Sequence, residues 1–190
     1  MKTPGASLLA LSLAGCMSVP LSYPDDWTPI VPPPASGACP ALAGTYADVG
    51  EATSGCVAGQ ACARLSFGLF AAMIGFEDRA SLAGAQVELR QPAPGLLEAI
   101  VRDGGREVTR GVLSAAKGDF ECTRRGLTLR ARGGRMVVAG GSQVPEERTF
   151  NRARDGALVM SREAIGSGQG VVVPVGEPAR YWVRWAARPY

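Results

Sequence analysis

The sequence predicts a mainly β protein, built as an antiparallel meander that closes into a small barrel or folds as a sandwich, with one short apolar helix. After residue 84, short runs of apolar and β-branched residues recur at roughly the 8–12-residue spacing of antiparallel β proteins. Asp-Gly and Gly-Gly pairs, which are typical of hairpin turns, separate many of these runs. Glycine is abundant, with 25 residues among 190, as expected for a chain with many tight turns.

The expected strands follow one another along the chain. The first is Gly44-Thr45-Tyr46, and the others cover residues 87–90, 96–102, 107–114, 120–123, 127–132, 136–139, 148–154, 157–162, 170–175 and 180–185. Turns are expected at Pro92-Ala93-Pro94-Gly95, Asp103-Gly104, Gly118-Asp119, Gly133-Gly134, Gly140-Gly141, Asp155-Gly156 and Gly166-Ser167-Gly168. In 127–132 apolar and polar residues alternate, and Tyr181, Val183 and Trp185 repeat this pattern. We expect the apolar members of both runs to face the core.

Residues 63–76 differ from the rest of the chain because almost all of them are apolar, so a helix formed by them would be apolar around most of its circumference. Leu65, Leu69, Ala72 and Phe76 recur at helical spacing, so this stretch is the one expected helix. Its fourteen residues are too few to span a bilayer. We expect the helix to pack in the core. The alternative is a helix that docks on a membrane or on a hydrophobic ligand.

The N-terminus carries the features of a secretory signal: a positive start at Met1-Lys2, an apolar run that ends at Leu13, and small residues after it. The tetrapeptide Leu13-Ala14-Gly15-Cys16 resembles the lipobox of bacterial lipoprotein precursors. The resemblance implies that residues 1–15 are a signal peptide, that the Cys16 thiol carries diacylglycerol (hence labelling by palmitate) and that its amine is acylated after cleavage. It also implies an outer-membrane location. In such lipoproteins, aspartate directly after the cysteine favours retention in the inner membrane, and this chain has Met17 at that position. An ordinary secretory signal is the alternative.

Residues 16–38 follow as a lipidated N-terminus and a proline-rich tether. Six prolines fall within 17–38, which excludes a helix or a central strand and favours extended geometry. At ~3.1 Å per residue, this spacer would hold a domain up to roughly 70 Å from the lipid surface. We expect it to be solvated, the alternative being that Tyr23 and Trp27 lie on lipid headgroups. Residues 39–190 are expected to form a single β-rich domain that faces the periplasm.

Four cysteines remain once Cys16 is assigned to the anchor. An even number in an exported chain predicts two disulfides, with three possible pairings. We favour Cys56 with Cys62, which closes a short loop, and Cys39 with Cys122, which ties the start of the domain to a strand in its middle. A metal site built from the four thiolates is the alternative, but the spacings lack a Cys-x-x-Cys knuckle.

The composition argues against catalysis. The chain has no histidine, which excludes Ser-His-Asp and Cys-His nucleophile systems and histidine-ligated zinc. Ser114-Ala115-Ala116-Lys117 matches the SxxK motif of penicillin-binding proteins, yet the Ser-Asp-Asn and Lys-Thr-Gly motifs of that family are absent from the sequence. The glycine-rich residues 166–170 lack a phosphate-binding lysine and indicate a turn. We therefore expect no enzyme activity, no cofactor and no metal.

Charge is unevenly distributed along the chain. Residues 39–104 hold four basic residues against seven acids, whereas residues 105–190 hold fifteen against eight. A face for an anionic partner is therefore expected on the second half, carried by Arg124, Arg125, Arg130, Arg132, Arg152 and Arg154. Its partner would be another envelope protein, lipopolysaccharide or peptidoglycan, and the exported location argues against nucleic acid. A solvated sheet face without a partner is the alternative.

Two further resemblances concern the folded part. Gly44-Thr45-Tyr46 resembles the Gly-x-aromatic opening of lipocalins, which are barrels that hold apolar ligands. The stretch CPALAGTYADVG, residues 39–50, is similar to the start of small uncharacterised lipoproteins of Gram-negative bacteria, a resemblance that implies no activity. The sequence thus predicts a lipid-anchored envelope protein with a structural or interaction role, and as the alternative a lipocalin-like carrier of a lipid or another apolar ligand.

Overall fold

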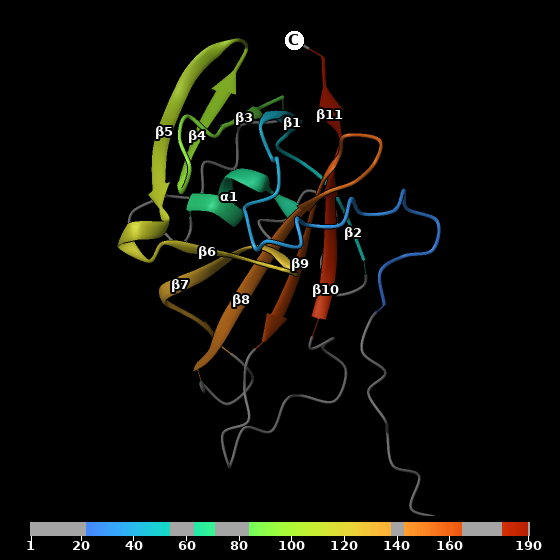
Figure 1. Ribbon diagram of the computed structural model, residues 1–190. Helices are drawn as coiled ribbons and strands as arrows, with labels where there is room; N and C mark the ends of the chain where they lie inside the picture. Colours follow the sequence, from blue (N-terminus) through green and yellow to red (C-terminus); the bar gives the residue numbers. More distant parts are fainter. Residues whose placement is uncertain (1–21, 54–62, 71–83, 138–142, 165–179, 190) are drawn as a thin grey trace, which may run out of the picture.

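The computed structural model describes residues 22–53, 63–70, 84–137, 143–164 and 180–189 (Figure 1). Within these ranges the protein is mainly β, with two antiparallel sheets and almost no helix. Sheet 1 has the strand order β11-β1-β3-β4-β5, and sheet 2 has the order β2-β10-β9-β8-β7-β6. The described strands leave two edges on each sheet, so no closed barrel is found among them.

The strands of sheet 1 are β1 (Gly44–Ala47), β3 (Gln86–Arg90), β4 (Leu96–Asp103), β5 (Arg106–Ser114) and β11 (Ala187–Arg188). The strands of sheet 2 are β2 (Glu51–Ala52), β6 (Phe120–Thr123), β7 (Gly126–Val137), β8 (Gln143–Arg152), β9 (Leu158–Ala164) and β10 (Arg180–Trp185). Between β4 and β5, Gly104 and Gly105 both have positive φ, at 55° and 81°. This is the backbone that a two-residue hairpin turn requires, and it explains the glycine pair.

Most expected strands are confirmed within a few residues, and one expected turn is wrong. Gly133-Gly134 does not form a hairpin, because β7 continues through it from Gly126 to Val137 and absorbs it at a register shift between Arg130 and Arg135. The two-residue strands β2 and β11 were not expected. The strand expected at 170–175 lies outside the described residues.

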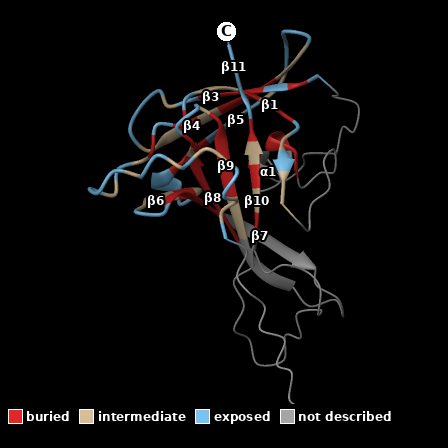
Figure 2. Cartoon of the chain, turned by 90° about the vertical axis from the view of Figure 1, so that its right-hand side faces the viewer, coloured by how far each residue is buried: buried red, intermediate tan, exposed pale blue. Residues whose placement is uncertain are grey.

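The two sheets share one hydrophobic core (Figure 2). Sheet 1 contributes Val87 and Val101, and sheet 2 contributes Leu127, Phe150 and Trp185, all of them at most 1% exposed. Phe150 and Trp185 stack with their ring centroids 6.3 Å apart. The alternation expected for 127–132 and for 181–185 is therefore confirmed for the residues whose burial is known, because their apolar members point inward.

The helix expected over 63–76 is described only over α1 (Leu65–Phe70), and residues 71–76 lie outside the described part. Leu65 and Leu69 are buried in the shared core. Asp48, which is fully buried, holds the start of α1: its Oδ1 accepts a hydrogen bond from the Ser66 N–H at 2.7 Å, and its carbonyl oxygen accepts one from the Leu65 N–H. A side-chain cap of this kind satisfies N–H groups that a helix leaves unpaired at its first turn.

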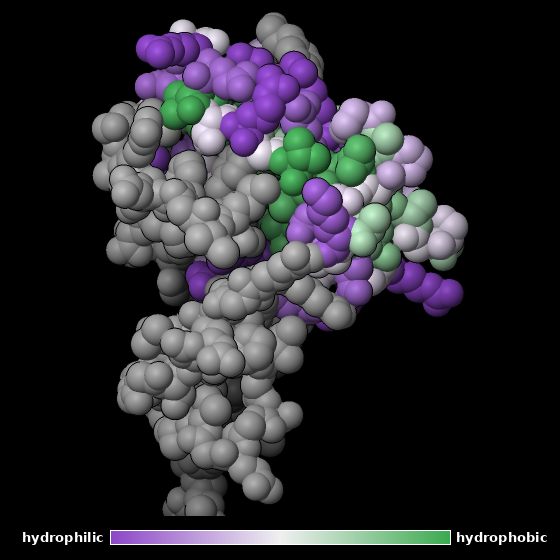
Figure 3. Space-filling model, turned by 90° about the vertical axis from the view of Figure 1, so that its left-hand side faces the viewer, coloured by the Kyte–Doolittle hydropathy of each residue, from purple (hydrophilic) through white to green (hydrophobic). Residues whose placement is uncertain are grey.

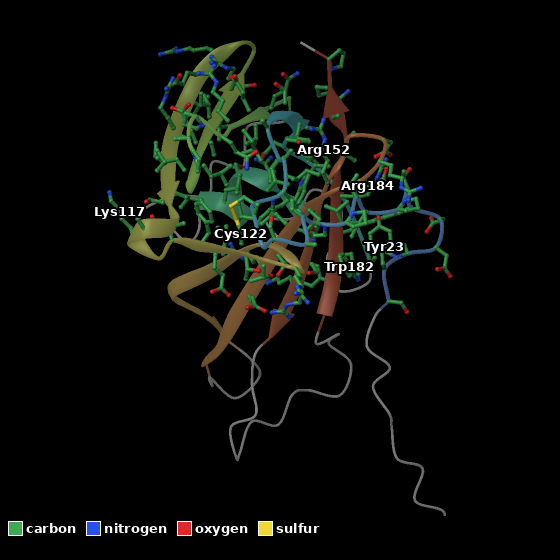
Figure 4. The ribbon with its side chains drawn as sticks, in the orientation of Figure 1. Tyr23, Lys117, Cys122, Arg152, Trp182 and Arg184 are labelled. Carbon is green, nitrogen blue, oxygen red and sulfur yellow. A yellow bond between two sulfur atoms is a disulfide. The ribbon has the colours of Figure 1, made fainter. Side chains whose placement is uncertain are left out.

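A disulfide joins Cys39 to Cys122, which confirms one of the two expected pairings. Cys39 precedes β1 of sheet 1 and Cys122 lies on β6 of sheet 2, so the bond ties the beginning of one sheet to the edge of the other (Figure 4). Cys56 and Cys62, expected to form the second disulfide, lie outside the described residues. Cys16, the expected lipid attachment site, also lies outside them.

Residues 22–31, which we call the N-terminal strap, pack on the outer face of sheet 2. Tyr23 meets Trp182 of β10 edge to face, with ring centroids 5.1 Å apart, and meets Trp27 in the same way at 5.9 Å (Figure 4). Burial raises the pKa of the Tyr23 hydroxyl, which donates a hydrogen bond to the Thr28 carbonyl oxygen at 2.6 Å.

The strap also bonds to the backbone of sheet 2. Ile30 forms an antiparallel bridge with Ala153, next to hydrogen bonds from the Val31 N–H to the Arg152 oxygen at 2.8 Å and from the Arg154 N–H to the Pro29 oxygen at 3.0 Å. Beneath it lies a second apolar cluster of Ala153, Ala157 and Val159. The expectation of a solvated spacer is therefore wrong for these residues, because prolines prevent a regular element but not packing of the aromatic side chains between them.

Candidate functional site

The inner face of sheet 2 changes from apolar to charged along its strands. Strand register places Leu127, Phe150, Met160 and Val183 in one row across β7, β8, β9 and β10, and all four belong to the core. Two residues further along each strand, on the same face, the next row reads Leu129, Arg148, Arg162 and Tyr181. This row, with its two arginines, is the candidate site.

Arg148 and Arg162 are direct antiparallel partners on β8 and β9. Side chains at such positions have their Cβ atoms about 4.5–5.5 Å apart, so the two cations are neighbours, an arrangement that by itself is unfavourable. Arg148 is only 8% exposed and lies beside Leu129, which is 1% exposed. Two arginine residues therefore stand side by side at the border of an apolar core.

Tyr181 orients one of the two guanidinium groups. Its hydroxyl oxygen accepts a hydrogen bond from Nη1 of Arg162, and the Arg162 Cζ atom lies 5.2 Å from the centroid of the Tyr181 ring. A guanidinium over an aromatic face gains a cation–π interaction, and the hydrogen bond fixes the plane of the fork. A fixed, planar fork of N–H donors is suited to carboxylate or phosphate oxygens.

Among the six arginines expected to form one anionic-partner face, Arg125 and Arg152 lie on opposite sides of sheet 2. Arg124 and Arg125 are exposed in the β6–β7 turn, and Arg125 reaches Glu147 on the outer side of β8 at 2.8 Å. Arg152 donates to the Ala43 carbonyl oxygen at 3.3 Å, on the inner side (Figure 4). Arg154 is exposed in the β8–β9 turn, and Arg130 and Arg132 lie on β7, where their side chains are not described.

Arg148 and Arg162 were not among the expected residues, although the sequence contains a signal for them. Arg148 stands two residues before Phe150, and Arg162 stands two residues after Met160. In a strand, residues two apart share a face, so each arginine must lie on the side of a core residue.

A second group of charges covers the outer face of sheet 1. Glu88 accepts hydrogen bonds from Arg90 at 2.6 Å and from Arg102 at 3.2 Å. Glu98 accepts one from Arg110 at 2.7 Å, and Arg110 also binds Glu107 at 2.8 Å. We call these six residues the charge lattice. The hydrogen bond from Arg90 holds the pKa of Glu88 below its usual value, and the one from Arg110 does the same for Glu107.

The charge lattice surrounds an outward-facing isoleucine. Ile100 lies between Glu98 and Arg102 along β4 and opposite Glu88 and Arg110 on the neighbouring strands, and it is fully buried. Figure 3 shows hydrophilic side chains gathered over the upper part of the face that carries β5. Three arginines and three glutamates neutralise one another here, so the lattice covers sheet 1 and leaves little net charge to attract an anion.

The SxxK match does not acquire the geometry of its motif. Ser114 ends β5, and Ala115–Lys117 forms a single turn of 3-10 helix, whereas the motif opens an α-helix in penicillin-binding proteins. Lys117 is exposed and projects from the side of the domain opposite the N-terminal strap (Figure 4). Within the described ranges, no three His, Cys, Asp or Glu side chains gather closely enough to hold a metal ion.

Comparison with known proteins found no matching family model, no similar curated protein and no similar solved structure. In the part of the chain that the structure describes, no helix has the length and apolar character needed to cross a bilayer.

Proposed function

We propose that this chain is a lipid-anchored protein of the bacterial cell envelope with a structural or interaction role. Cys16 would carry the lipid, and the β domain would face the periplasm from the outer membrane. The N-terminal sequence Leu13-Ala14-Gly15-Cys16 and the Met17 that follows support this proposal. The Cys39–Cys122 disulfide is in keeping with an oxidising compartment such as the periplasm.

The packing of the N-terminal strap is the structural observation that most supports a position close to the membrane. Only five residues lie between Cys16 and Ser22, and the six Cα-to-Cα steps, at no more than ~3.6 Å each, span roughly 20 Å. The aromatic contacts of Tyr23 with Trp182 and the bridge between Ile30 and Ala153 hold the chain to sheet 2 from that point on. An anchored domain would therefore sit close to the lipid surface, within reach of other components of the membrane.

An interaction module is favoured over a lipocalin-like carrier by the contents of the core. A carrier would need space beside the apolar helix, but Leu65 and Leu69 of α1 are buried in the same core cluster as bulky side chains such as Tyr46 and Trp185. We also propose that the two sheets are the halves of an open sandwich, which is supported by two strand orders that share no strand.

Replacement of the anchor residue tests this function. In the Cys16→Ala variant, we expect labelling by radioactive palmitate to disappear and the protein to leave the membrane fraction. Ser18→Ala, a small change two residues away, is the matched control and should keep both properties. Persistent palmitate labelling of Cys16→Ala would show that the lipid is attached elsewhere and would contradict Cys16 as the anchor.

A further inference from the structure

We propose that Asp103-Gly104, at the tip of the β4–β5 hairpin, is a site of spontaneous covalent modification at which the aspartate becomes isoaspartate. The reaction needs only the chain and water, and it does not depend on acylation of Cys16. A second Asp-Gly pair, Asp155-Gly156, lies in the β8–β9 turn, and arginine precedes the aspartate in both pairs. Because the two pairs share the sequence Arg-Asp-Gly, a difference in their reactivity reports on the structure around them.

The reaction proceeds through a cyclic imide. The backbone nitrogen of Gly104 attacks the side-chain carboxyl carbon of Asp103 in its protonated form, and the bond from that carbon to its hydroxyl oxygen breaks. The hydroxyl group leaves as water with the amide proton, which gives a five-membered succinimide. Water then opens the ring. Addition at the side-chain carbonyl carbon restores aspartate, whereas addition at the main-chain carbonyl carbon breaks the original peptide bond and leaves isoaspartate.

The product has the same mass as the original chain but a different backbone. In isoaspartate the main chain runs through the former side chain and is longer by a methylene group. A two-residue hairpin turn requires a particular backbone geometry, so the lengthened chain cannot keep it. The modification would therefore loosen the end of the hairpin beside Arg102 and Glu107, two members of the charge lattice.

The tip of the β4–β5 hairpin leaves room for the reaction. Gly104 and Gly105 are exposed, and apart from adjacent residues no heavy atom of the described chain lies within 4 Å of the position that a Cβ would take on either glycine. The hydrogen bond that closes a two-residue turn joins the residues on either side of it, here Asp103 and Arg106. It does not involve the Gly104 N–H, which is the group that has to attack.

The hairpin tip can also open at low cost. Ring closure requires the backbone at Asp103 to rotate out of its extended form, so the turn has to open locally. Asp103 and Arg106 are the last pair of the β4–β5 ladder, at its upper end in Figure 1, and the register shifts between Val101 and Arg102 just behind them. A bulge disrupts the ladder locally, and the ends of such elements open with less free energy than the core.

The reacting groups of Asp155-Gly156 are held in place instead. The Gly156 N–H donates a hydrogen bond to the Ala153 carbonyl oxygen at 3.0 Å, and Oδ1 of Asp155 accepts one from the Ala157 N–H at 3.1 Å. Oδ2 of Asp155 binds Arg184. Although burial by itself would raise the pKa of Asp155, these hydrogen bonds hold that pKa below its usual value, so the carboxyl group stays in its unreactive ionised form.

The N-terminal strap restrains the β8–β9 turn further. The Arg154 N–H donates to the Pro29 carbonyl oxygen at 3.0 Å, and the Thr28 side chain forms a hydrogen bond with the Asp155 carboxylate. Opening of this turn would therefore break contacts to the strap as well as those within the turn. The structure thus protects one Arg-Asp-Gly sequence and leaves the other reactive.

Peptide mapping of the purified full-length protein tests the proposal. The folded protein is kept for several weeks in mildly acidic buffer, and a second sample is kept in urea. Chromatography with tandem mass spectrometry separates isoaspartyl from aspartyl peptides of equal mass, and an isoaspartate methyltransferase quantifies them. In the folded protein, we expect isoaspartate to accumulate at Asp103 at least several-fold faster than at Asp155. In urea, where the turn contacts are lost, the two rates should become similar.

Two glutamate variants assign the signal to its position. Asp103→Glu keeps the charge but would need a six-membered ring, which closes far more slowly, so the isoaspartyl peptide of the hairpin should disappear. Asp155→Glu is the matched control and should leave the modification at Asp103 unchanged. The proposal is overturned if the folded wild type gains no isoaspartate at Asp103, or if it gains as much at Asp155.

Asparagine at position 103 gives an independent readout. In Asp103→Asn the same ring closes with loss of ammonia instead of water, and its hydrolysis produces a carboxylate. This variant should therefore slowly regain a negative charge, which isoelectric focusing detects, and only freshly purified material is a neutral variant. If the charge of folded Asp103→Asn stays constant over the same weeks, the Gly104 nitrogen is not accessible and the proposal is wrong.

Discussion

The outer faces of the two sheets are covered in different ways. On sheet 1, three arginines and three glutamates pair with one another around the buried Ile100. On sheet 2, the N-terminal strap lays Tyr23, Trp27 and Ile30 over the apolar cluster of Ala153, Ala157 and Val159. One sheet thus covers its apolar surface with charges from its own strands, and the other with a segment from elsewhere in the chain.

Because the two sheets are covered in different ways, their covers should respond differently to pH and to salt. The cover of sheet 1 depends on ionised carboxylates, so it should weaken in acid and in salt. The cover of sheet 2 depends on aromatic burial, so it should be insensitive to both.

Loss of the disulfide between the two differently covered sheets should have the largest effect on stability. Cys39 and Cys122 are separated by 83 residues, and the chain-entropy relation gives about 4.6 kcal/mol for a loop of this length. We expect the Cys39→Ser, Cys122→Ser double variant to lose most of this free energy of unfolding in urea. A loss below about 1 kcal/mol would mean that the sheets are held together almost entirely by their shared core.

Removal of the Trp27 ring from the N-terminal strap should have an intermediate effect. Trp27→Ala should lower the free energy of unfolding by about 2 kcal/mol, because Trp27 is partly buried against the apolar cluster. It should also expose the strap to proteases under native conditions. Trp27→Phe, which keeps an aromatic ring, is the control and should lose less than half as much. If both variants unfold as the wild type does, the strap contributes nothing to the fold.

The charge lattice should have the smallest effect, and its effect should depend on pH. The pKa of Glu88 is lowered in the folded state, so its contribution is present above the ordinary carboxyl value near 4.5 and is lost as pH falls through the folded value. We expect Glu88→Gln to cost about 1 kcal/mol at pH 7 and almost nothing at pH 2.

Urea unfolding of wild type and Glu88→Gln at several pH values measures this difference. Asp103→Asn, on the β4–β5 hairpin of the same sheet, controls for the general effect of removing one negative charge. Trp27→Ala should cost the same at pH 7 and pH 3, because its contribution is hydrophobic. An equal cost of Glu88→Gln at every pH would contradict the ionic account of the sheet 1 cover.

Local patterns were enough to predict the strands. Residues 120–123 and 180–185 were expected with the bounds that β6 and β10 have, because alternation and flanking turns define them within a few residues. The pair Gly133-Gly134 predicts a turn because glycine pairs usually mark one, but β7 accommodates it at an irregularity in its pairing with β8. Strands of two residues, such as β2, carry no alternation from which to predict them.

Features that depend on long-range contacts were not predictable in this way. The six prolines of the tether indicate its local geometry. They do not indicate that Tyr23 meets Trp182, more than 150 residues later in the sequence. The candidate site has the same origin: Arg148 and Arg162 become neighbours only through the register of β8 and β9. The sequence shows that Arg148 and Arg162 lie on the same strand faces as Phe150 and Met160, but it does not show that the two arginines are close to each other.

The central claim is that the N-terminal strap belongs to the folded domain and holds it close to its anchor. Amide hydrogen exchange at Val31 and Arg154 in the full-length protein tests this most directly, because these N–H groups bond to the Arg152 and Pro29 oxygens only when the strap is docked. We predict that both amides exchange as slowly as those that pair β8 with β9. Exchange of the Val31 amide at the rate of an unstructured peptide would contradict the account.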